Sequence, residues 1–530
     1  MNRKIKYYVV LPLLTVSALV LTVLAAYNFY SIYSFKVYLI SPQTKILVSS
    51  EFPATILIKG KRMPAEIEVY IDDKMTQRIN ANTFEYTDLG LIKIANLKID
   101  PLYLPGGVHS MTILLKGGPF IKDSKITKEF IYEKMSPVPG KPDEERIQKM
   151  RAFFAEDVSD LIVRLNNARD YYVNSDWRNS DKYREQKEKV KNADVDAAVK
   201  EKLLRLVSGI EDKEDVNEID NITNSLNLEL FNKGYPFAGL MFEYRYNNGT
   251  TASYFLSYEI TEVTTPDPEN PSRKVGILKR LDGMNIREQF LGIKLPNSPF
   301  SFILDESLEL AVKRCTAAAS KDNDESVKEI RRMTGHYSLN DSDAKFLSEK
   351  IREEIQAAAR RESLSALVKN SNAFHEIRHL NDYKDARNIG SRVPDVLKYF
   401  FPGVSGESVF NIDSSFTLEK EICETLLKVN PEFSAYLYEL VKSAGLRRYV
   451  LLSLFERIIN PDKEDTSHHW ASKLIIYHLA KAFNFADEDL VSLPAAGNED
   501  EWFSLVKRLI ELPYGSIEKE ASLLLLNNYR

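Results

Sequence analysis

The sequence predicts a multidomain protein with an N-terminal transmembrane helix, an all-β module and a mainly α (α+β) region that contains a small β-sheet. Three patterns predict it: an uncharged apolar run over residues 7–28, apolar and polar alternation within 36–134, and helical periodicity over most of 143–530. A chain of 530 residues is too long to fold around one hydrophobic core, so about two to four domains are expected. Hydrophobic and charged contents of 44% and 28% are typical of folded chains, and the net charge of −5 argues against a nucleic-acid partner.

The N-terminus predicts export and a membrane anchor. Residues 1–6 carry Arg3, Lys4 and Lys6, and the apolar run that follows is about as long as a helix needs to cross a bilayer, roughly 20 residues. Basic flanks stay in the cytoplasm, so the sequence predicts a single-pass protein of the inner (cytoplasmic) membrane with the bulk of the chain periplasmic or extracytoplasmic. A cleaved signal peptide remains the alternative, because residues 23–25 offer a weak cleavage site.

Residues 36–134 predict a β-sandwich of short strands. Residues 65–71, 110–115 and 126–132 read as strands, with turns at 72–73 and 105–107. The order of Val69-Tyr-Ile-Asp72, then Leu104-Pro-Gly-Gly-Val-His109, then a strand resembles bacterial immunoglobulin-like domains. In that pattern we expect His109 to be a structural histidine at the start of a strand.

The rest of the chain divides by composition. Residues 136–142 hold three prolines and a glycine, which predicts a linker. Residues 143–234 predict helices with solvated charged faces. Residues 235–300 predict a small β-sheet region, because two strand-like stretches flank the turn Asn247-Asn-Gly249. Residues 301–530 predict a second, larger helical region. The two cysteines, Cys315 and Cys423, are expected to be buried apolar side chains, although a pairing between them stays open.

The strongest chemical signal is His375-Glu376-Ile377-Arg378-His379, an H-E-x-x-H motif in a chain with only seven histidines. On a helix, residues four apart lie one above the other, so both imidazoles can bind one zinc ion while the glutamate acts as general base on a zinc-activated water. The helical period places His375 and His379 on the same face as Leu364, Leu367, Val368 and Ser371, so we expect both to point inward.

A zinc site of this type needs a third protein ligand. Three acids lie on a later predicted helix: Glu419, Glu421 and Glu424. Glu421 flanks the apolar face of that helix and is the preferred ligand, with Glu419 next. Asp382 and Asp385 are further possibilities, and Asp382, three residues after His379, is better placed to orient its imidazole.

A β-hairpin region, helices, H-E-x-x-H and a later helix-borne glutamate resemble the zincin metallopeptidases in their gluzincin arrangement. The resemblance implies a zinc metalloendopeptidase that hydrolyses peptide bonds in peptide or protein substrates, with Zn²⁺ held by His375, His379 and Glu421. It implies Glu376 as general base and a histidine or tyrosine that stabilises the oxyanion, for which His469 is preferred over His468 and His478.

Two alternatives stay open. The chain could be a catalytically inactive zincin-like protein that serves in envelope assembly or binding, or the histidines could be core residues of an envelope scaffold that binds no metal.

Overall fold

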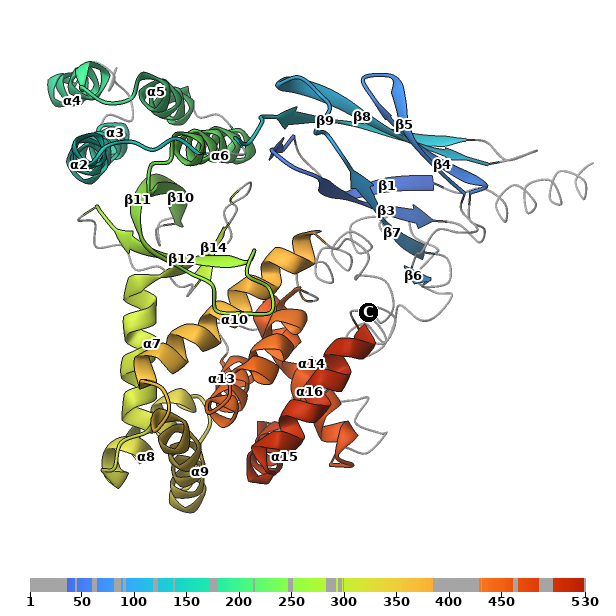
Figure 1. The fold of residues 1–530 in the computed structure, drawn as a ribbon, viewed down its shortest axis with the longest axis vertical. Helices are drawn as coiled ribbons and strands as arrows, with labels where there is room; N and C mark the ends of the chain where they lie inside the picture. The colour runs from blue at the N-terminus through green and yellow to red at the C-terminus, as the bar shows by residue number, and fades with distance from the viewer. Residues whose placement is uncertain are drawn as a thin grey trace, which may run out of the picture.

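The computed structural model describes residues 36–528, except for 43–44, 60–63, 81–86, 89–91, 118–122, 137–138, 172–179, 213–214, 246–250, 283–291, 294–297, 299, 385–428, 430, 461–465 and 486–498. The chain forms an N-terminal β-sheet region followed by a mainly helical part (Figure 1). The predicted anchor at 7–28 lies outside the described residues. Among the helices that are described, none combines the length and the apolar character needed to span a bilayer.

The N-terminal region is a sandwich of two sheets. One has the order β1-β3-β7-β6 and the other β2-β9-β8-β4-β5. The strands are β1 (Lys36–Ser41), β2 (Leu47–Val48), β3 (Phe52–Lys59), β4 (Glu66–Ile71), β5 (Lys74–Asn80), β6 (Thr87–Asp88), β7 (Ile92–Ile99), β8 (Gly107–Lys116) and β9 (Ser124–Tyr132). Alternate residues of these strands, such as Ile56, Val69 and Ile113, fill the space between the sheets, as the alternating pattern predicts.

His109 joins two turns of this sandwich. Its Nδ1 lies 2.6 Å from Asp72 Oδ2 and its Nε2 lies 2.9 Å from the carbonyl oxygen of Pro105. Asp72 has a positive φ of 48°, so the turn between β4 and β5 takes a strained conformation that the histidine contact helps to hold. The structural role expected for His109 is confirmed.

A helical layer follows: α2 (Glu144–Ala152), the π-helical turn η2 (Phe153–Val158), α3 (Ser159–Tyr171), α4 (Asp181–Asn192), α5 (Ala197–Asp212) and α6 (Val216–Lys233). Their apolar faces form a core of their own with Phe237 and Phe255 of the neighbouring sheet. The charged residues of α4 face solvent or pair locally, as Lys187 does with Glu211 at 2.7 Å.

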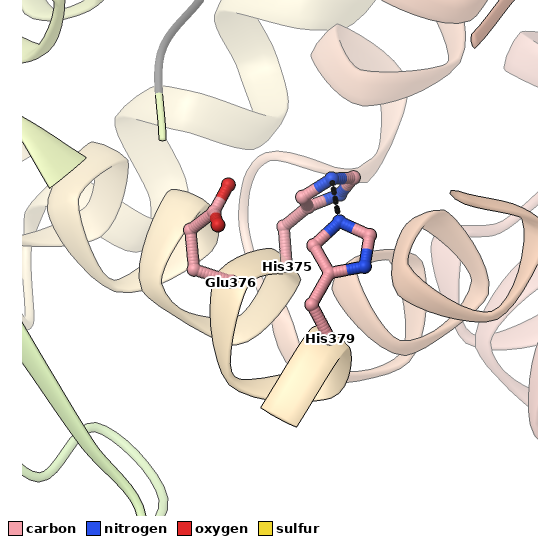
Figure 2. A group of neighbouring side chains, drawn as sticks. All are labelled: His375, Glu376 and His379. Atoms are coloured by element: carbon pink, nitrogen blue, oxygen red, sulfur yellow. Dashed lines mark hydrogen bonds between the residues drawn. The ribbon is translucent and has the colours of Figure 1, made fainter. Parts of the chain in front are cut away.

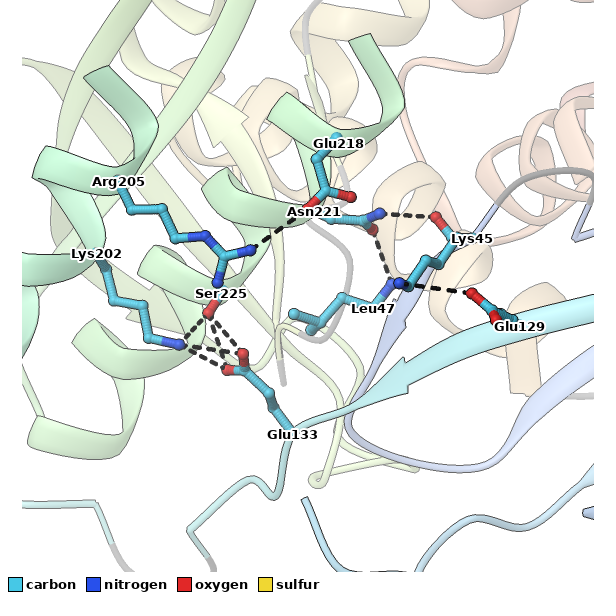
Figure 3. Close-up of polar contacts among 9 residues, drawn as sticks. All are labelled: Lys45, Leu47, Glu129, Glu133, Lys202, Arg205, Glu218, Asn221 and Ser225. Carbon is cyan, nitrogen blue, oxygen red and sulfur yellow. Dashed lines mark hydrogen bonds and ion pairs between the residues drawn. The ribbon is translucent and has the colours of Figure 1, made fainter. Parts of the chain in front are cut away.

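Polar contacts fix the sandwich against this helical layer (Figure 3). The backbone N–H of Leu47 donates to Asn221 Oδ1 at 2.8 Å, and Asn221 Nδ2 donates to the carbonyl oxygen of Lys45 at 2.7 Å. Nearby, Glu133 accepts from Ser225 Oγ at 2.8 Å and from Lys202 Nζ at 3.1 Å. The linker after β9 is held as well, because the Ser136 N–H donates to Asn232 Oδ1 at 2.7 Å.

The small sheet has the order β10-β11-β12-β14-β13, with β10 (Phe237–Arg245), β11 (Thr251–Thr264), β12 (Lys274–Arg280), β13 (Gly292–Ile293) and β14 (Phe300–Leu304). β10 and β11 form the antiparallel hairpin that the sequence predicts. β12 and β14 are parallel, and the short strand β13 pairs antiparallel with β14 at the edge of the sheet.

The C-terminal helices build the largest core. They are α7 (Asp305–Ala318), α8 (Asn323–Met333), α9 (Asp341–Ala359), α10 (Leu364–Lys384), the helical residues 431–442, α13 (Arg447–Ile459), α14 (Ser467–Ala482), α15 (Glu499–Glu511) and α16 (Tyr514–Asn528). In Figure 1, α10 runs diagonally beneath the small sheet, and it contacts α7, β12 and β14. Cys315 on α7 is a buried free thiol, as expected, while Cys423 lies outside the described residues.

Candidate metal centre

Helix α10 carries the H-E-x-x-H motif between the small sheet and the C-terminal helices. Leu367 and Val368, which share a helix face with His375, are buried in the largest core, and Ile377 on the opposite face is buried in it as well. Ser301 Oγ on β14 donates to the carbonyl oxygen of Glu376 at 2.7 Å, which ties the motif to the sheet. The predicted inward face of this helix is therefore confirmed.

The two histidines of the motif face each other. His375 Nε2 and His379 Nε2 lie 3.2 Å apart, and the two ring centroids are 4.8 Å apart. Figure 2 shows the rings turned toward each other with the Glu376 carboxylate beside them. One ligand atom from each of these three residues lies within 4.8 Å of the others, so the group could hold a metal ion.

Glu376 is packed against the edge strand β13. A Cβ atom added to Gly292 would lie 2.1 Å from Glu376 Oε1, so no residue larger than glycine fits at this position without movement. Glu376 is 7% exposed, and the close approach of Gly292 holds its carboxylate at the edge of the sheet.

A further acid, Glu432, completes the group. Its Oε2 lies 3.4 Å from His375 Nε2, and its Oε1 lies 3.7 Å from His379 Nε2. Glu432 lies near the start of the helical residues 431–442, directly after Pro431. Glu432 is not among the candidate ligands predicted from the sequence. The i, i+4, i+7 spacing of Glu432, Tyr436 and Glu439 is the signal that could have placed these residues on one helix face.

Glu439 supports the other side of the first histidine. Its Oε2 lies 3.5 Å from His375 Nδ1, an ion-pair distance without the geometry of a hydrogen bond. Its Oε1 accepts from Ser371 Oγ at 2.8 Å, and Ser443 Oγ donates to Ser371 Oγ at 2.9 Å. This chain of contacts sets the orientation of the His375 ring, the arrangement commonly found around metal-binding histidines.

Two aromatic side chains border the group. The Tyr436 ring lies 4.5 Å from the His375 ring, between centroids. His468 Nδ1, at the start of α14, lies 3.0 Å from both Glu432 Oε2 and the Tyr436 hydroxyl oxygen. The His468 side chain is 41% exposed, so it is the accessible histidine at this end of the group.

The remaining predicted residues fall elsewhere. Glu419, Glu421, Glu424 and Asp385 lie outside the described residues, as does the side chain of Asp382. His469 Nδ1 lies 3.1 Å from the carbonyl oxygen of Arg457, and the His478 ring is 6.1 Å from the Phe433 ring, between centroids. The roles predicted for Glu421 and His469 stay predictions.

Charge and burial act against each other within the group. Desolvation alone would lower the pKa of His375, but the contacts with Glu432 and Glu439 outweigh it and raise that pKa. Burial would raise the pKa of Glu432, and its contacts with His375 and His468 instead lower it well below its usual value. Burial raises the pKa of Glu376 to about 8, against the attraction of His375. The group therefore concentrates negative charge on Glu432.

The donor atoms fit a zinc ion. Zinc–nitrogen and zinc–oxygen bonds of about 2.1 Å in a tetrahedron place neighbouring donor atoms about 3.4 Å apart. The two Nε2 atoms lie 3.2 Å apart and His375 Nε2 lies 3.4 Å from Glu432 Oε2, close to that value, while His379 Nε2 lies 3.7 Å from the other oxygen, Oε1. Glu432 Oε2 is also buried without a hydrogen bond of normal geometry, as a metal-ligating oxygen would be.

Comparison with known proteins identifies no family. No protein-family model matches the chain, and no curated protein does. Among solved structures, the chain is similar at 16% identity to the endo-β-1,4-mannanase from Thermotoga petrophila, over 19% of this chain and 20% of that one, with a TM-score of 0.15. The match thus spans about a fifth of that enzyme.

Proposed function

We propose that this protein is a zinc-dependent metallopeptidase whose ion is held by His375, His379 and Glu432. The observation that carries the proposal is the convergence of two imidazole nitrogens and one carboxylate at separations of 3.2, 3.4 and 3.7 Å. Two histidines with one glutamate are a known donor set of catalytic zinc, and they leave one coordination position open. Glu432 here takes the place that the sequence predicted for Glu421.

The chemistry divides between the ion and the protein. A bound zinc ion supplies Lewis acidity toward a carbonyl and lowers the pKa of a coordinated water to about 7. Glu376 accepts a proton from the attacking water and then delivers it to the leaving amine. A cation beside Glu376 favours its ionised form, which brings its pKa down from about 8 toward the range suited to a base.

The edge of the small sheet offers a place for an extended peptide. β13 pairs with β14 on one side, and none of the other described strands pairs with it. A peptide that added to the free edge of β13 would pass Glu376, because Gly292 of that strand contacts its carboxylate. His468 is exposed at the opposite end of the group and is the candidate donor to the oxyanion.

Hydrolysis of an unfolded protein tests the proposal. The full chain in detergent should release peptides from casein, and a chelator should stop the reaction until zinc is restored. Glu376→Gln should lower kcat by at least about 100-fold, because it removes the general base, while Glu349→Gln on the exposed face of α9 should not change it. Undiminished cleavage by Glu376→Gln would refute the assignment of the base.

We further propose that the enzyme is exported and held in the inner membrane by residues 7–28, with its site outside the cytoplasm. The apolar length and the basic flank of that segment support the proposal. The full chain should sediment with membranes and resist extraction by salt and carbonate. A released mature form that begins near Ala26 would instead indicate a cleaved signal.

A further inference from the structure

Arg457 on α13 lies beside the metal centre with one aromatic ring between them. Its guanidinium carbon is 5.2 Å from the centroid of the Tyr436 ring, and that ring is 4.5 Å from the His375 ring. Tyr436 is 4% exposed, whereas Arg457 is only partly buried. The backbone carbonyl of Arg457 is 3.1 Å from His469 Nδ1, which fixes this turn of α13 against the start of α14.

Within the described part of the chain, the Arg457 guanidinium forms no hydrogen bond and no ion pair. The nearby acids are engaged with other groups. Glu456 pairs with Arg314 at 3.0 Å, and Glu432 contacts His468 at 3.0 Å. Other partly or fully buried arginines of this region do have partners, as Arg447 does in Glu518.

An arginine held in this way has donors ready for an anion. A guanidinium is charged at every accessible pH, and its planar N–H groups match the two oxygens of a carboxylate. Burial would lower the pKa of Arg457, but the neighbouring Tyr436 and Glu456 raise it, so the charge is retained. Even partial burial of such a charge has a desolvation cost, which a bound anion offsets.

We propose that Arg457 binds a carboxylate of the peptide substrate and so determines specificity at the metal centre. The inference rests on the proposed peptidase function for the identity of its ligand. A peptide carries this chemistry at its free C-terminus and on aspartate or glutamate side chains. Since only the Tyr436 ring separates Arg457 from His375, the bond that is cleaved lies within a few residues of the bound carboxylate.

Binding to an inactive full chain tests the inference without turnover. Zinc-loaded Glu376→Gln protein is titrated into four labelled short peptides that differ only in a free or amidated C-terminus and in one glutamate or glutamine. We expect the peptides that carry the recognised carboxylate to bind about 10- to 100-fold more tightly than the matching peptides in which that group is a neutral amide. This is the range for a hydrogen bond to a charged group. A difference between the free and the amidated C-terminus identifies the C-terminal carboxylate as the group that is bound. A difference between glutamate and glutamine identifies a side-chain carboxylate.

Arg457→Met in the same protein should remove that preference, and Arg457→Lys should keep part of it. Arg508→Met, which removes an exposed arginine stacked on Phe485, should leave it intact. Equal affinity of all four peptides for the parent protein would overturn the inference even if Arg457→Met fails to fold. A preference that survives Arg457→Met would overturn it too. Selective binding without hydrolysis by the native chain would refute only the proposed function.

Discussion

His375 Nδ1 faces the Glu439 carboxylate at 3.5 Å, while its Nε2 faces the Glu432 carboxylate at 3.4 Å. One imidazole is therefore held from both sides by acids of the same helical segment, 431–442. Ser371, one turn before His375 on α10, donates to Glu439 at 2.8 Å and completes the support. In the proposed site, Glu432 is the metal ligand and Glu439 orients the ring.

The role of Glu439 predicts a weaker but intact metal site in Glu439→Gln. Loss of the carboxylate beside Nδ1 lowers the basicity of the imidazole and loosens its orientation, which typically reduces metal affinity about 10- to 100-fold. Competition with a chelating dye measures the zinc affinity of the full chain. Glu349→Gln, an exposed acid on α9, serves as control. An affinity within about twofold of the parent protein would assign Glu439 a purely structural role.

The identity of the third ligand can be decided by two substitutions. Glu432→Ala removes a carboxylate that lies 3.4 and 3.7 Å from the two histidines, so we expect loss of bound zinc. Glu421→Ala should retain the metal. Zinc content after dialysis measures both. The reverse result, retention in Glu432→Ala and loss in Glu421→Ala, would restore the ligand expected from the sequence.

The contact between the sandwich and α6 predicts a large effect of Asn221→Ala. Asn221 is 5% exposed and satisfies both the Leu47 N–H and the Lys45 carbonyl. Its loss leaves two backbone groups without partners and should cost about 2–4 kcal/mol of stability. Hydrogen exchange at the Leu47 amide and thermal unfolding measure the effect. Asn192→Ala, at the exposed end of α4, should stay within about 0.5 kcal/mol of the parent protein.

A buried aspartate, Asp267, accepts a hydrogen bond from the helical segment 431–442, which carries Glu432. Asp267 is 1% exposed and accepts from the Tyr438 hydroxyl at 2.5 Å and from Asn270 Nδ2 at 2.7 Å. Burial would raise its pKa, yet these hydrogen bonds and Lys442 hold the pKa below its usual 3.8.

A lowered pKa gives a defined pH dependence. The stability that the Asp267 carboxylate contributes is complete above the unfolded-state pKa near 3.8 and is lost as the pH falls through the lower folded-state value. Asp267→Asn should therefore be less stable than the parent protein at pH 7, by about 1–3 kcal/mol, and the difference should shrink below about pH 4. Thermal unfolding between pH 7 and pH 3 measures it. A difference that stays constant over this range would contradict the charged role of Asp267.

Local patterns predicted much of this architecture. Alternation of apolar and polar residues placed β4, β8 and β9 to within a few residues, because one face of each strand is buried. The i, i+4 spacing placed His375 and His379 on one inward face, because the geometry of a helix is independent of its surroundings. The linker at 136–142 was recognised by its prolines, but its hydrogen bonds to Asn232 depend on a helix almost a hundred residues later.

The third acid could not be predicted in the same way. A carboxylate that flanks an apolar helix face looks alike in Glu421 and Glu432, and only tertiary packing decides which of them reaches α10. Glu439 could not be singled out either, because nothing local indicates that Ser371 of another helix hydrogen-bonds to it. Arg457 could not be predicted from the sequence either, because its position beside Tyr436 and His375 depends on the packing of separate helices.

The central claim is that His375, His379 and Glu432 share one metal ion. Zinc content of the purified full chain tests it most directly, measured beside His375→Ala and beside His336→Ala, which changes an exposed histidine. We predict one zinc per chain in the parent protein and in His336→Ala, and almost none in His375→Ala. A parent protein without zinc, or a His375→Ala protein with a full complement, would contradict the account.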